Sequence, residues 1–282
     1  MSNGRKTWFI TGASSGFGRA FAAHALERGY DVVATARNVA KLQDLAEPDP
    51  ERVLTLELDV DRSGAAEGAL EAAIARFGRI DVVINNAGYG IVGALEETPE
   101  TELRAIMETN FFGAMAVIRA ALPILRAQGG GAIVNISSLG GQLSFAGFSA
   151  YSASKFALEG ASEALAQEVA PFGIKVLIVE PGAFRTDFAA ASLRHMPTVE
   201  AYQAIVGPTR SFARRMDGTQ EGDPRKAAAA IEQALDAEAT PLRLQLGADS
   251  VAAVRSHAET LLADMGKWEH VSHGTSFPPR PV

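Results

Sequence analysis

The sequence contains no cysteine among its 282 residues. Without cysteine there is no disulfide framework, no thiolate chemistry and no cysteine-ligated metal site, and the composition fits a reducing compartment. The five histidines are not spaced with carboxylates in the way that metal ligands usually are, so we expect no metal site.

Long apolar runs and basic runs are also missing. No uninterrupted apolar stretch approaches the ~18 residues that a membrane helix needs, and the apolar segment that ends at Thr11 is too short for a secretory leader. The net charge is −7, and lysine and arginine form no run, which disfavours a nucleic-acid partner. These absences favour a soluble cytoplasmic protein with neither a membrane nor a nucleic acid as its partner.

What the sequence does contain is an alternation of short, β-branched apolar runs with helical periodicity. Continuous apolar strands divided by helices indicate a parallel sheet that is covered on both faces. We therefore predict an α/β, doubly wound Rossmann-type fold with a mostly parallel seven-stranded sheet and helices on both faces. The expected strands are residues 7–10, 31–35, 53–58, 81–84, 132–136, 175–179 and 242–246, and the expected helices are 16–28, 64–77, 100–128, 150–170 and 225–238.

Short signals mark the ends of these helices. Thr98-Pro99 and Asp223-Pro224 each place a capping residue before a proline, which we expect at the first helical position. Gly129 is expected to end the long middle helix.

No linker or internal repeat divides the chain, so we expect a single catalytic domain over residues 1–282. Residues 183–223 carry no strand pattern, and a segment of this length is typical of a functional lid or a disordered insert. We interpret it as a substrate lid. A C-terminal helical extension is expected at about 248–282, with a helix from Ser250 to about Met265 and then a polar, proline-rich end.

A glycine-rich loop, TGASSGFG, follows the first expected strand and opens into a helix. Glycines in such a loop let the backbone approach a pyrophosphate, whose charge then meets the helix N-terminus. The spacing is G-x-x-x-G-x-G, and by itself the loop is also compatible with a plain strand-to-helix turn. We predict a dinucleotide site that includes Gly12, Ser14, Ser15, Gly16, Phe17 and Gly18.

The end of the second strand indicates which dinucleotide is bound. An acidic residue there would bind the ribose hydroxyls of NAD, but this strand ends at Ala36 and is followed by Arg37. A guanidinium binds a phosphate through charge-assisted hydrogen bonds. We therefore favour NADP(H) over NAD(H), with the 2′-phosphate on Arg37 and on the hydroxyl of Ser14 or Ser15. The alternative is a solvated loop arginine.

Two further strand ends carry polar residues. Asp59 and Val60 follow the third strand, and Asn86, Ala87 and Gly88 follow the fourth. Open α/β sheets bind ligands at this edge, and Asp59 could accept a hydrogen bond from an adenine amino group. Turn formation without any ligand remains the alternative for the asparagines.

Six motifs occur in order along the chain. They are TGASSGFG, NNAG, ETNFFG with Asn110, NISS with Ser138, YSASK from Tyr151 to Lys155, and PGAFRT. Together they resemble the short-chain dehydrogenase/reductase family from about residue 6 to about residue 190. Within it the chain is similar to the subgroup of 17β-hydroxysteroid and retinol dehydrogenase-like enzymes.

The resemblance implies a catalytic tetrad of Asn110, Ser138, Tyr151 and Lys155. Ser138 would hold the substrate oxygen, Lys155 would also hold the nicotinamide ribose, and Asn110 would kink its helix and support a water that leads to the lysine. Tyr151 and Lys155 share one helix face, and a cation at this distance is expected to lower the tyrosine pKa from ~10. Tyr151 is then the general acid/base. For Tyr151 and Lys155 the alternative is an ordinary amphipathic pair on a dimer-facing helix. For Ser138 and Asn110 the alternative is local side-chain-to-backbone hydrogen bonding.

The resemblance also implies roles after the sixth strand. Pro181 and Gly182 would let the backbone pass the nicotinamide, and Phe184 and Thr186 would contact its carboxamide end. Apolar side chains gather near the motif ends and suggest a pocket for a small apolar carbonyl or alcohol substrate: Tyr89, Leu139, Phe145, Phe148, Phe184 and Phe188.

We therefore expect an NADP(H)-dependent oxidoreductase of class EC 1.1.1.- that transfers hydride between nicotinamide and a carbonyl or secondary alcohol. An NADP-binding redox sensor or regulatory protein with little catalysis is an alternative, and a methyltransferase is a weaker one. The resemblance implies a homodimer or homotetramer that pairs through the helices at about 100–128 and 150–170.

Overall fold

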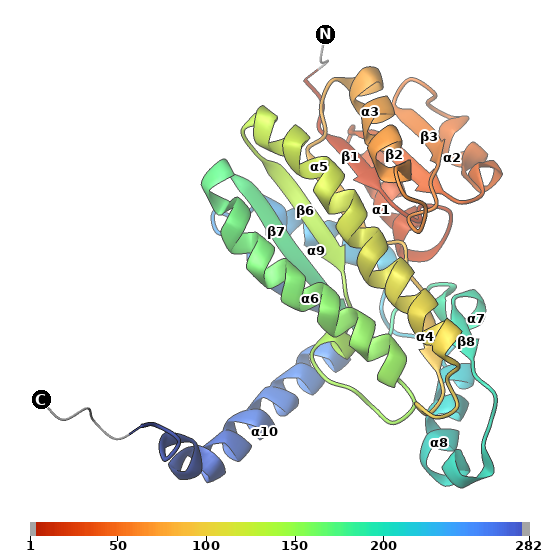
Figure 1. Ribbon diagram of the computed structural model, residues 1–282. Helices are drawn as coiled ribbons and strands as arrows, with labels where there is room; N and C mark the ends of the chain where they lie inside the picture. Colours follow the sequence, from red (N-terminus) through yellow and green to blue (C-terminus); the bar gives the residue numbers. More distant parts are fainter. Residues whose placement is uncertain (1–3, 278–282) are drawn as a thin grey trace, which may run out of the picture.

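A computed structural model of the protein describes residues 4–277. Seven strands form one parallel sheet in the order β3-β2-β1-β4-β6-β7-β9, which confirms the predicted fold (Figure 1). The strand order reverses at β1, which lies between β2 and β4, and ligands bind at such switch points. The strands are β1 (Thr7–Ile10), β2 (Asp31–Ala36), β3 (Val53–Glu57), β4 (Val82–Asn85), β6 (Gly131–Ile136), β7 (Ile174–Pro181) and β9 (Arg243–Leu246).

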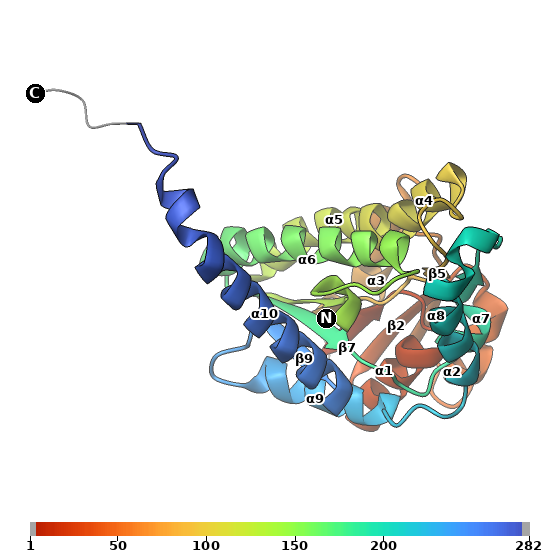
Figure 2. The ribbon, with the colours of Figure 1, turned by 90° about the horizontal axis from the view of Figure 1, so that it is seen from below.

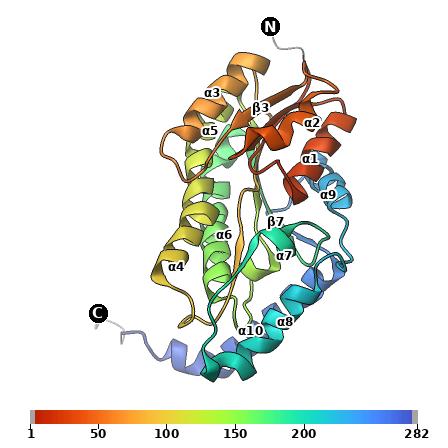
Figure 3. The same ribbon diagram turned by 90° about the vertical axis from the view of Figure 1, so that its right-hand side faces the viewer.

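Helices cover both faces of this sheet (Figure 3). Alternate residues of a strand point to opposite faces, so Trp8 and Ile10 pack with α1 and α9 while Phe9 packs with α3 and α5. Both faces of the sheet are buried, and the strands are therefore continuous apolar runs. The covering helices are α1 (Gly16–Glu27), α2 (Gln43–Ala46) and α9 (Pro224–Asp236) on one face, and α3 (Ala65–Phe77), α5 (Ala114–Gln128) and α6 (Ser149–Val169) on the other.

The helix predicted at 100–128 is present but changes its winding in the middle. It consists of α4 (Glu100–Met107), a π-helical segment η2 (Glu108–Gly113) and α5. Within the described part of the chain, Glu100–Gln128 is also the helix that is long and apolar enough to cross a membrane. Its residues Val117 and Leu125 are fully buried against the sheet, as in the core helix of a globular protein.

One of the two proline caps is confirmed and the other is shifted. Asp223 caps α9, since its Oδ1 accepts a hydrogen bond from the Arg225 amide at 2.9 Å and Pro224 is the first helical residue. The prediction for Thr98-Pro99 is wrong by one residue. Pro99 is itself the N-cap of α4 with an extended ψ of 145°, and the Thr98 hydroxyl donates to the Ala94 carbonyl instead.

The predicted lid segment, 183–223, is more regular than its pattern indicates. It holds α7 (Phe188–Ala191), η5 (Glu200–Tyr202) and α8 (Gln203–Arg215), and it also holds a short strand, β8 (Leu193–His195). The expectation of no strand character is therefore wrong. β8 pairs in parallel with β5 (Gly90–Val92), and three-residue strands are too short to show a period in the sequence.

The C-terminal helix is longer than predicted. α10 (Ala248–His273) begins before Ser250 and continues well past Met265, because Gly266 costs a helix only ~1 kcal/mol. It leaves the body of the protein as a projecting arm (Figures 1 and 2). The proline-rich end that we expected, residues 278–282, lies outside the described residues.

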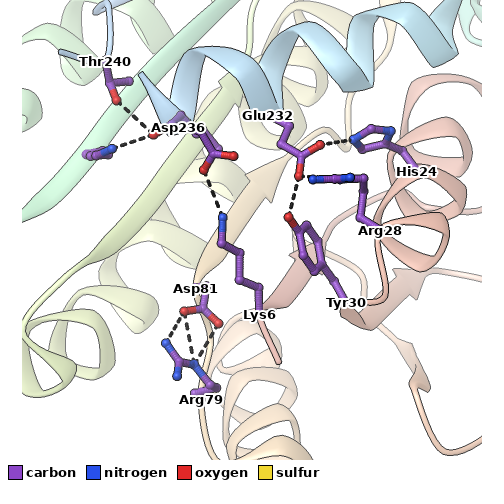
Figure 4. A network of polar contacts seen from close by, with 11 residues as sticks. Lys6, His24, Arg28, Tyr30, Arg79, Asp81, Glu232, Asp236 and Thr240 are labelled. Carbon is purple, nitrogen blue, oxygen red and sulfur yellow. Dashed lines mark hydrogen bonds and ion pairs between the residues drawn. The ribbon is translucent and has the colours of Figure 1, made fainter. Parts of the chain in front are cut away.

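A polar network joins α9 to α1 on the face opposite α5 (Figure 4). The Glu232 carboxylate accepts hydrogen bonds from Tyr30 Oη at 2.5 Å and Arg28 Nε at 3.0 Å, and its other oxygen lies 2.8 Å from His24 Nε2. Burial opposes ionisation, but these three partners together lower the pKa of Glu232 to about 2. The network therefore fixes α9 against α1.

We predict that Glu232→Gln lowers the free energy of unfolding by about 1–3 kcal/mol at pH 7. A depressed folded-state pKa stabilises the protein above the unfolded value of ~4.3 and loses this effect as the pH falls toward 2. The difference between wild type and variant, measured by urea unfolding, should therefore narrow between pH 5 and pH 3. Asp236→Asn is the control, because its ion pair with Lys6 is exposed and of little weight. A pH-independent difference would contradict this prediction.

Candidate active site

A cavity of about 840 Å³ opens at the carboxyl ends of the strands. It brings together residues that are far apart in the sequence, from the ends of β1, β2, β3, β4, β6 and β7 and the loops after them, and from the start of α6. The predicted cofactor and tetrad residues that line it are Gly12, Ser14, Ser15, Gly16, Phe17, Arg37, Asp59, Val60, Asn86, Ala87, Gly88, Ser138, Tyr151, Lys155, Pro181, Gly182, Phe184 and Thr186. Gly18 and Asn110 do not line it.

The glycine loop is held in place by the end of β4. Asn86 Nδ2 donates to the carbonyls of Thr11 at 2.9 Å and Gly12 at 3.1 Å. Gly18 lies behind the loop, where a Cβ atom would overlap the Gly12 carbonyl oxygen and the Asn86 amide. Gly18 therefore permits close packing of α1 on the loop and does not itself face the cavity. The N-terminus of α1 faces the cavity through Ser15 and Gly16.

Arg37 follows directly on β2 at the rim of the cavity. Its side chain is exposed, and it makes no hydrogen bond or ion pair with any of residues 4–277. Asp59, which follows β3, also lines the cavity. The guanidinium is thus available to an anionic group at this end of the cavity.

Lys155 is one helical turn beyond Tyr151 on α6, and both side chains reach the cavity. Lys155 is 6% exposed, and its ammonium donates to the Ile136 carbonyl at 2.9 Å and lies 5.8 Å from the centre of the Tyr151 ring. Burial lowers the pKa of Lys155 to about 8, and the nearby carboxylate of Glu159 opposes this change. The lysine therefore exchanges protons close to neutral pH.

The pKa of Tyr151 departs from our expectation. Burial raises it to about 12, although a hydrogen bond with Ser138 acts in the opposite direction. We had expected the lysine to lower it, but desolvation of the phenolate is the larger effect here. Tyr151 is consequently a neutral phenol at pH 7, with its proton in place. Ser138 is fixed beside it, since its Oγ accepts a hydrogen bond from the Gly140 amide at 3.0 Å.

Asn110 lies behind the cavity wall in the π-helical segment η2. Its Oδ1 accepts from the Tyr89 amide at 3.0 Å, and its Nδ2 donates to the Tyr89 carbonyl at 2.9 Å and to Ser154 Oγ at 3.0 Å. The side chain therefore ties the helix to the loop after β4 and to α6. Gly88 lies between Asn110 and Lys155, so that a Cβ there would approach both side chains.

The other half of the cavity is apolar. The six side chains that we expected there all line it: Tyr89, Leu139, Phe145, Phe148, Phe184 and Phe188. The rings of Phe148 and Phe188 flank Tyr151, with centroids 6.2 and 5.8 Å away. Sequence patterns did not identify Thr209, Phe212 and Met216, which α8 and the turn after it bring over the same space.

A buried ion pair holds α8 in this position. Arg210 Nη2 donates to Glu97 Oε2 at 2.7 Å, and Nη1 donates to the Met196 carbonyl at 2.8 Å. Glu97 also accepts from the Val199 amide at 2.8 Å, and both charged side chains are less than a tenth exposed. Breaking such a pair leaves an uncompensated buried charge, so the lid is fixed over the cavity by charge as well as by apolar packing.

A second buried cluster lies behind Ser138 and was also missed. Glu159, one turn beyond Lys155 on α6, accepts from Ser137 Oγ at 2.5 Å and from Gln142. The Glu159 carboxylate has room here because residue 141 is a glycine. A Cβ atom at this position would overlap the carboxylate. Arg243 of β9 lies 3.3 Å from Glu159.

Glu180 of β7 completes this cluster. Arg243 Nε lies 3.4 Å from its Oε1, and Gln245 donates to its Oε2 at 2.7 Å. Burial, together with the neighbouring charge of Glu159, raises the pKa of Glu180 to about 7, although Gln245 and Arg243 oppose the shift. The cluster thus joins α6 to the ends of β6, β7 and β9, which carry the rim of the cavity.

This geometry defines a Rossmann-type oxidoreductase site, and comparison with known proteins identifies its family. The family model for short chain dehydrogenases matches residues 6–197. The oxidoreductase BOA17 of Botryotinia fuckeliana is 44% identical over 269 residues, which are 95% of this chain and 98% of that protein. The chain belongs to the short-chain dehydrogenase family, and the family resemblance is confirmed.

Solved structures agree with this assignment. A short-chain dehydrogenase from Streptomyces avermitilis is 52% identical, with a TM-score of 0.92 over 98% of this chain and 100% of that one. A 3-ketoacyl-(acyl-carrier-protein) reductase from Brucella melitensis, complexed with NADH, is 25% identical with a TM-score of 0.72 over 86% of this chain and 96% of that one.

We predict that Glu159→Gln lowers the pKa of Lys155 further below its value of about 8, because the anion that favours the ammonium is lost. An NMR titration of the lysine side chains would measure it, with Lys155→Met to assign the signal. Glu163→Gln is the matched control, since Glu163 also pairs with Arg243 but is half exposed. Equal titration curves for the two variants would contradict a specific effect of Glu159.

Proposed function

We propose that this protein is an NADP(H)-dependent oxidoreductase that transfers hydride between nicotinamide and a carbonyl or secondary alcohol. The observation that carries the proposal is that Ser138, Tyr151 and Lys155 line the same cavity as the glycine loop. A proton donor and a nucleotide-binding loop on one cavity are what hydride transfer to a carbonyl needs.

The residues present fit a nicotinamide dinucleotide. The α1 N-terminus and the loop from Gly12 to Gly16 would hold the pyrophosphate, and Asp59 would face the adenine. Pro181 and Gly182 would lie along the nicotinamide, with Phe184 and Thr186 at its carboxamide end. When bound, the cofactor supplies or accepts the hydride.

The preference for NADP(H) rests on the end of β2. Ala36 stands where an acidic residue would bind the ribose hydroxyls of NAD, and the adjacent guanidinium of Arg37 has no partner within residues 4–277. A free guanidinium at the cavity rim is suited to the 2′-phosphate.

Side chains of the protein supply the proton that the substrate oxygen needs. In the direction of reduction, the neutral phenol of Tyr151 donates its proton to the substrate oxygen, which Ser138 orients with its hydroxyl. Lys155, protonated below about pH 8, favours the phenolate that this step leaves behind. Asn110 is a positioning residue, because it fixes η2 against the loop after β4 and against α6.

The aromatic half of the cavity supports a small, mainly apolar substrate. Phe145, Phe148 and Phe188 supply its walls, and Phe212 of α8 closes it from the lid side. Such a lining is compatible with the hydroxysteroid and retinol dehydrogenase-like subgroup, and it favours ketones and aldehydes with an apolar body.

We predict that Ala36→Asp combined with Arg37→Ala lowers the NADP/NAD ratio of kcat/KM by about 10–100-fold, because a charge-assisted phosphate contact is replaced by repulsion. Steady-state kinetics with both cofactors would measure the ratio. Arg126→Ala is the control, because Arg126 lies in the last turn of α5 and does not line the cavity. An unchanged ratio would remove Arg37 from the cofactor site.

We further predict that Tyr151→Phe lowers kcat by ~10²–10⁴-fold while NADPH binding, measured by calorimetry, persists. The variant keeps the ring packing against Phe148 and Phe188 and loses only the proton donor. Tyr202→Phe is the matched control, because Tyr202 does not line the cavity and its hydroxyl donates to the exposed carboxylate of Glu96. Substantial residual turnover in the Tyr151 variant would refute the assigned role.

A further inference from the structure

The projecting helix α10 carries a feature that the catalytic proposal does not use. It is 26 residues long, and only Ser250 among them is buried. Its first turn is fixed to the cavity rim, where Ser250 Oγ donates to the Glu180 carbonyl at 2.7 Å and Asp249 Oδ2 accepts from the Ala183 amide at 2.7 Å. Beyond that turn the helix extends away from the sheet (Figures 1 and 2).

Large apolar side chains gather on the projecting part. Leu261, Met265 and Trp268 are 56%, 64% and 65% exposed, and Leu262 beside them is 64% exposed. Their spacing of three and four residues places them on one helix face. Toward the N-terminal end of α10, its base, the same helix face carries Val254 and then Ser250, where α10 packs on its own domain. The exposed stripe is thus the continuation of a packing face.

A stripe of this kind in water needs a partner. An isolated helix gains little stability from its propensity alone, and most helices are held by tertiary packing of an apolar face. A membrane surface is a poor match, because helices that lie on membranes are rich in lysine and arginine. α10 carries four acidic side chains against two basic ones, and the whole chain has a net charge of −7.

We infer that the stripe binds α10 of a second copy of this chain in an antiparallel helix pair. The charges beside the stripe are self-complementary in that arrangement. Arg255 and Glu269 lie on the same flank, equally far in sequence on either side of Leu262. A two-fold axis near Leu262 places each Arg255 opposite Glu269 of the other copy, and an isologous contact forms both pairs at once.

The pairing brings the far end of one α10 to the base of the other. The base lines the active-site cavity through Asp249 and Ala253. Trp268 of the second copy would therefore lie near the part of α10 that adjoins the rim. This surface is separate from the helices at 100–128 and 150–170, so the two modes of association can be tested independently.

The first test measures the mass of the full-length protein in solution by light scattering. Leu261→Glu combined with Met265→Glu is expected to halve the mass of the assembly. Ala263→Glu combined with His270→Glu places the same two charges on the opposite helix face and is expected to leave the mass unchanged. An unchanged mass for the first variant overturns the inference, as does an equal loss in both.

The second test separates antiparallel pairing of α10 from any other partner. Arg255→Glu and Glu269→Arg should each raise the dissociation constant of the assembly by about tenfold, because each single change opposes like charges. The double variant should restore it. The absence of native cysteine also allows a clean crosslink: Leu262→Cys should join two copies through a short bis-maleimide, and Ala263→Cys should not.

Failure of the charge swap to restore association overturns the antiparallel register. Binding of wild-type protein to phosphatidylcholine vesicles, lost in the Leu261→Glu and Met265→Glu variant while the mass is unchanged, would assign the stripe to a membrane and overturn the inference. None of these readouts depends on turnover, so they stand or fall separately from the proposed activity.

Discussion

The site depends on one buried cation at the junction of α6 and β6. Lys155 is almost fully enclosed, and its ammonium donates to the Ile136 carbonyl at 2.9 Å. Burying an ammonium is costly unless hydrogen bonds and an opposite charge compensate it. The strand carbonyl supplies the first, and Glu159 on the next helical turn supplies the second. Because the compensation is partial, the lysine pKa falls to about 8, within reach of a proton transfer.

The same compensation organises the rest of the rim. Glu159 needs its own partners, which come from the β6–α6 loop and from Arg243 of β9, and Arg243 in turn lies against Glu180 of β7. One charge at the centre is thus connected to the loop after β6, to β7 and to β9. Ser138 follows β6, Pro181 is the last residue of β7, and α10 begins just after β9. Precise placement of the reactive groups follows from satisfying buried charge, which loop packing alone would not achieve.

The parts that sequence reasoning predicted are those in which one local pattern has one physical cause. Strands buried on both faces become apolar runs, and the pair Tyr151 and Lys155 follows from helical spacing. The parts that it missed are meetings of distant residues. Arg210 of the lid segment forms an ion pair with Glu97, which precedes α4, and nothing near either residue in the sequence indicates this pairing. The direction of the Tyr151 pKa was wrong for a related reason, since spacing reveals a neighbouring charge but not the depth of burial.

Two segments that leave adjacent strands border the cavity. The chain leaves β7 into the lid segment and leaves β9 into α10, and the two departures are joined by the Ala183 amide and Asp249. Phe184, the next residue after Ala183, packs on Phe17 of the glycine loop with ring centroids 5.1 Å apart. The first turn of α10 is therefore connected to the glycine-loop end of the cavity through the Asp249 hydrogen bond and the contact between these two rings. In the inferred pair, the second copy would hold the arm whose first turn makes these contacts at the rim.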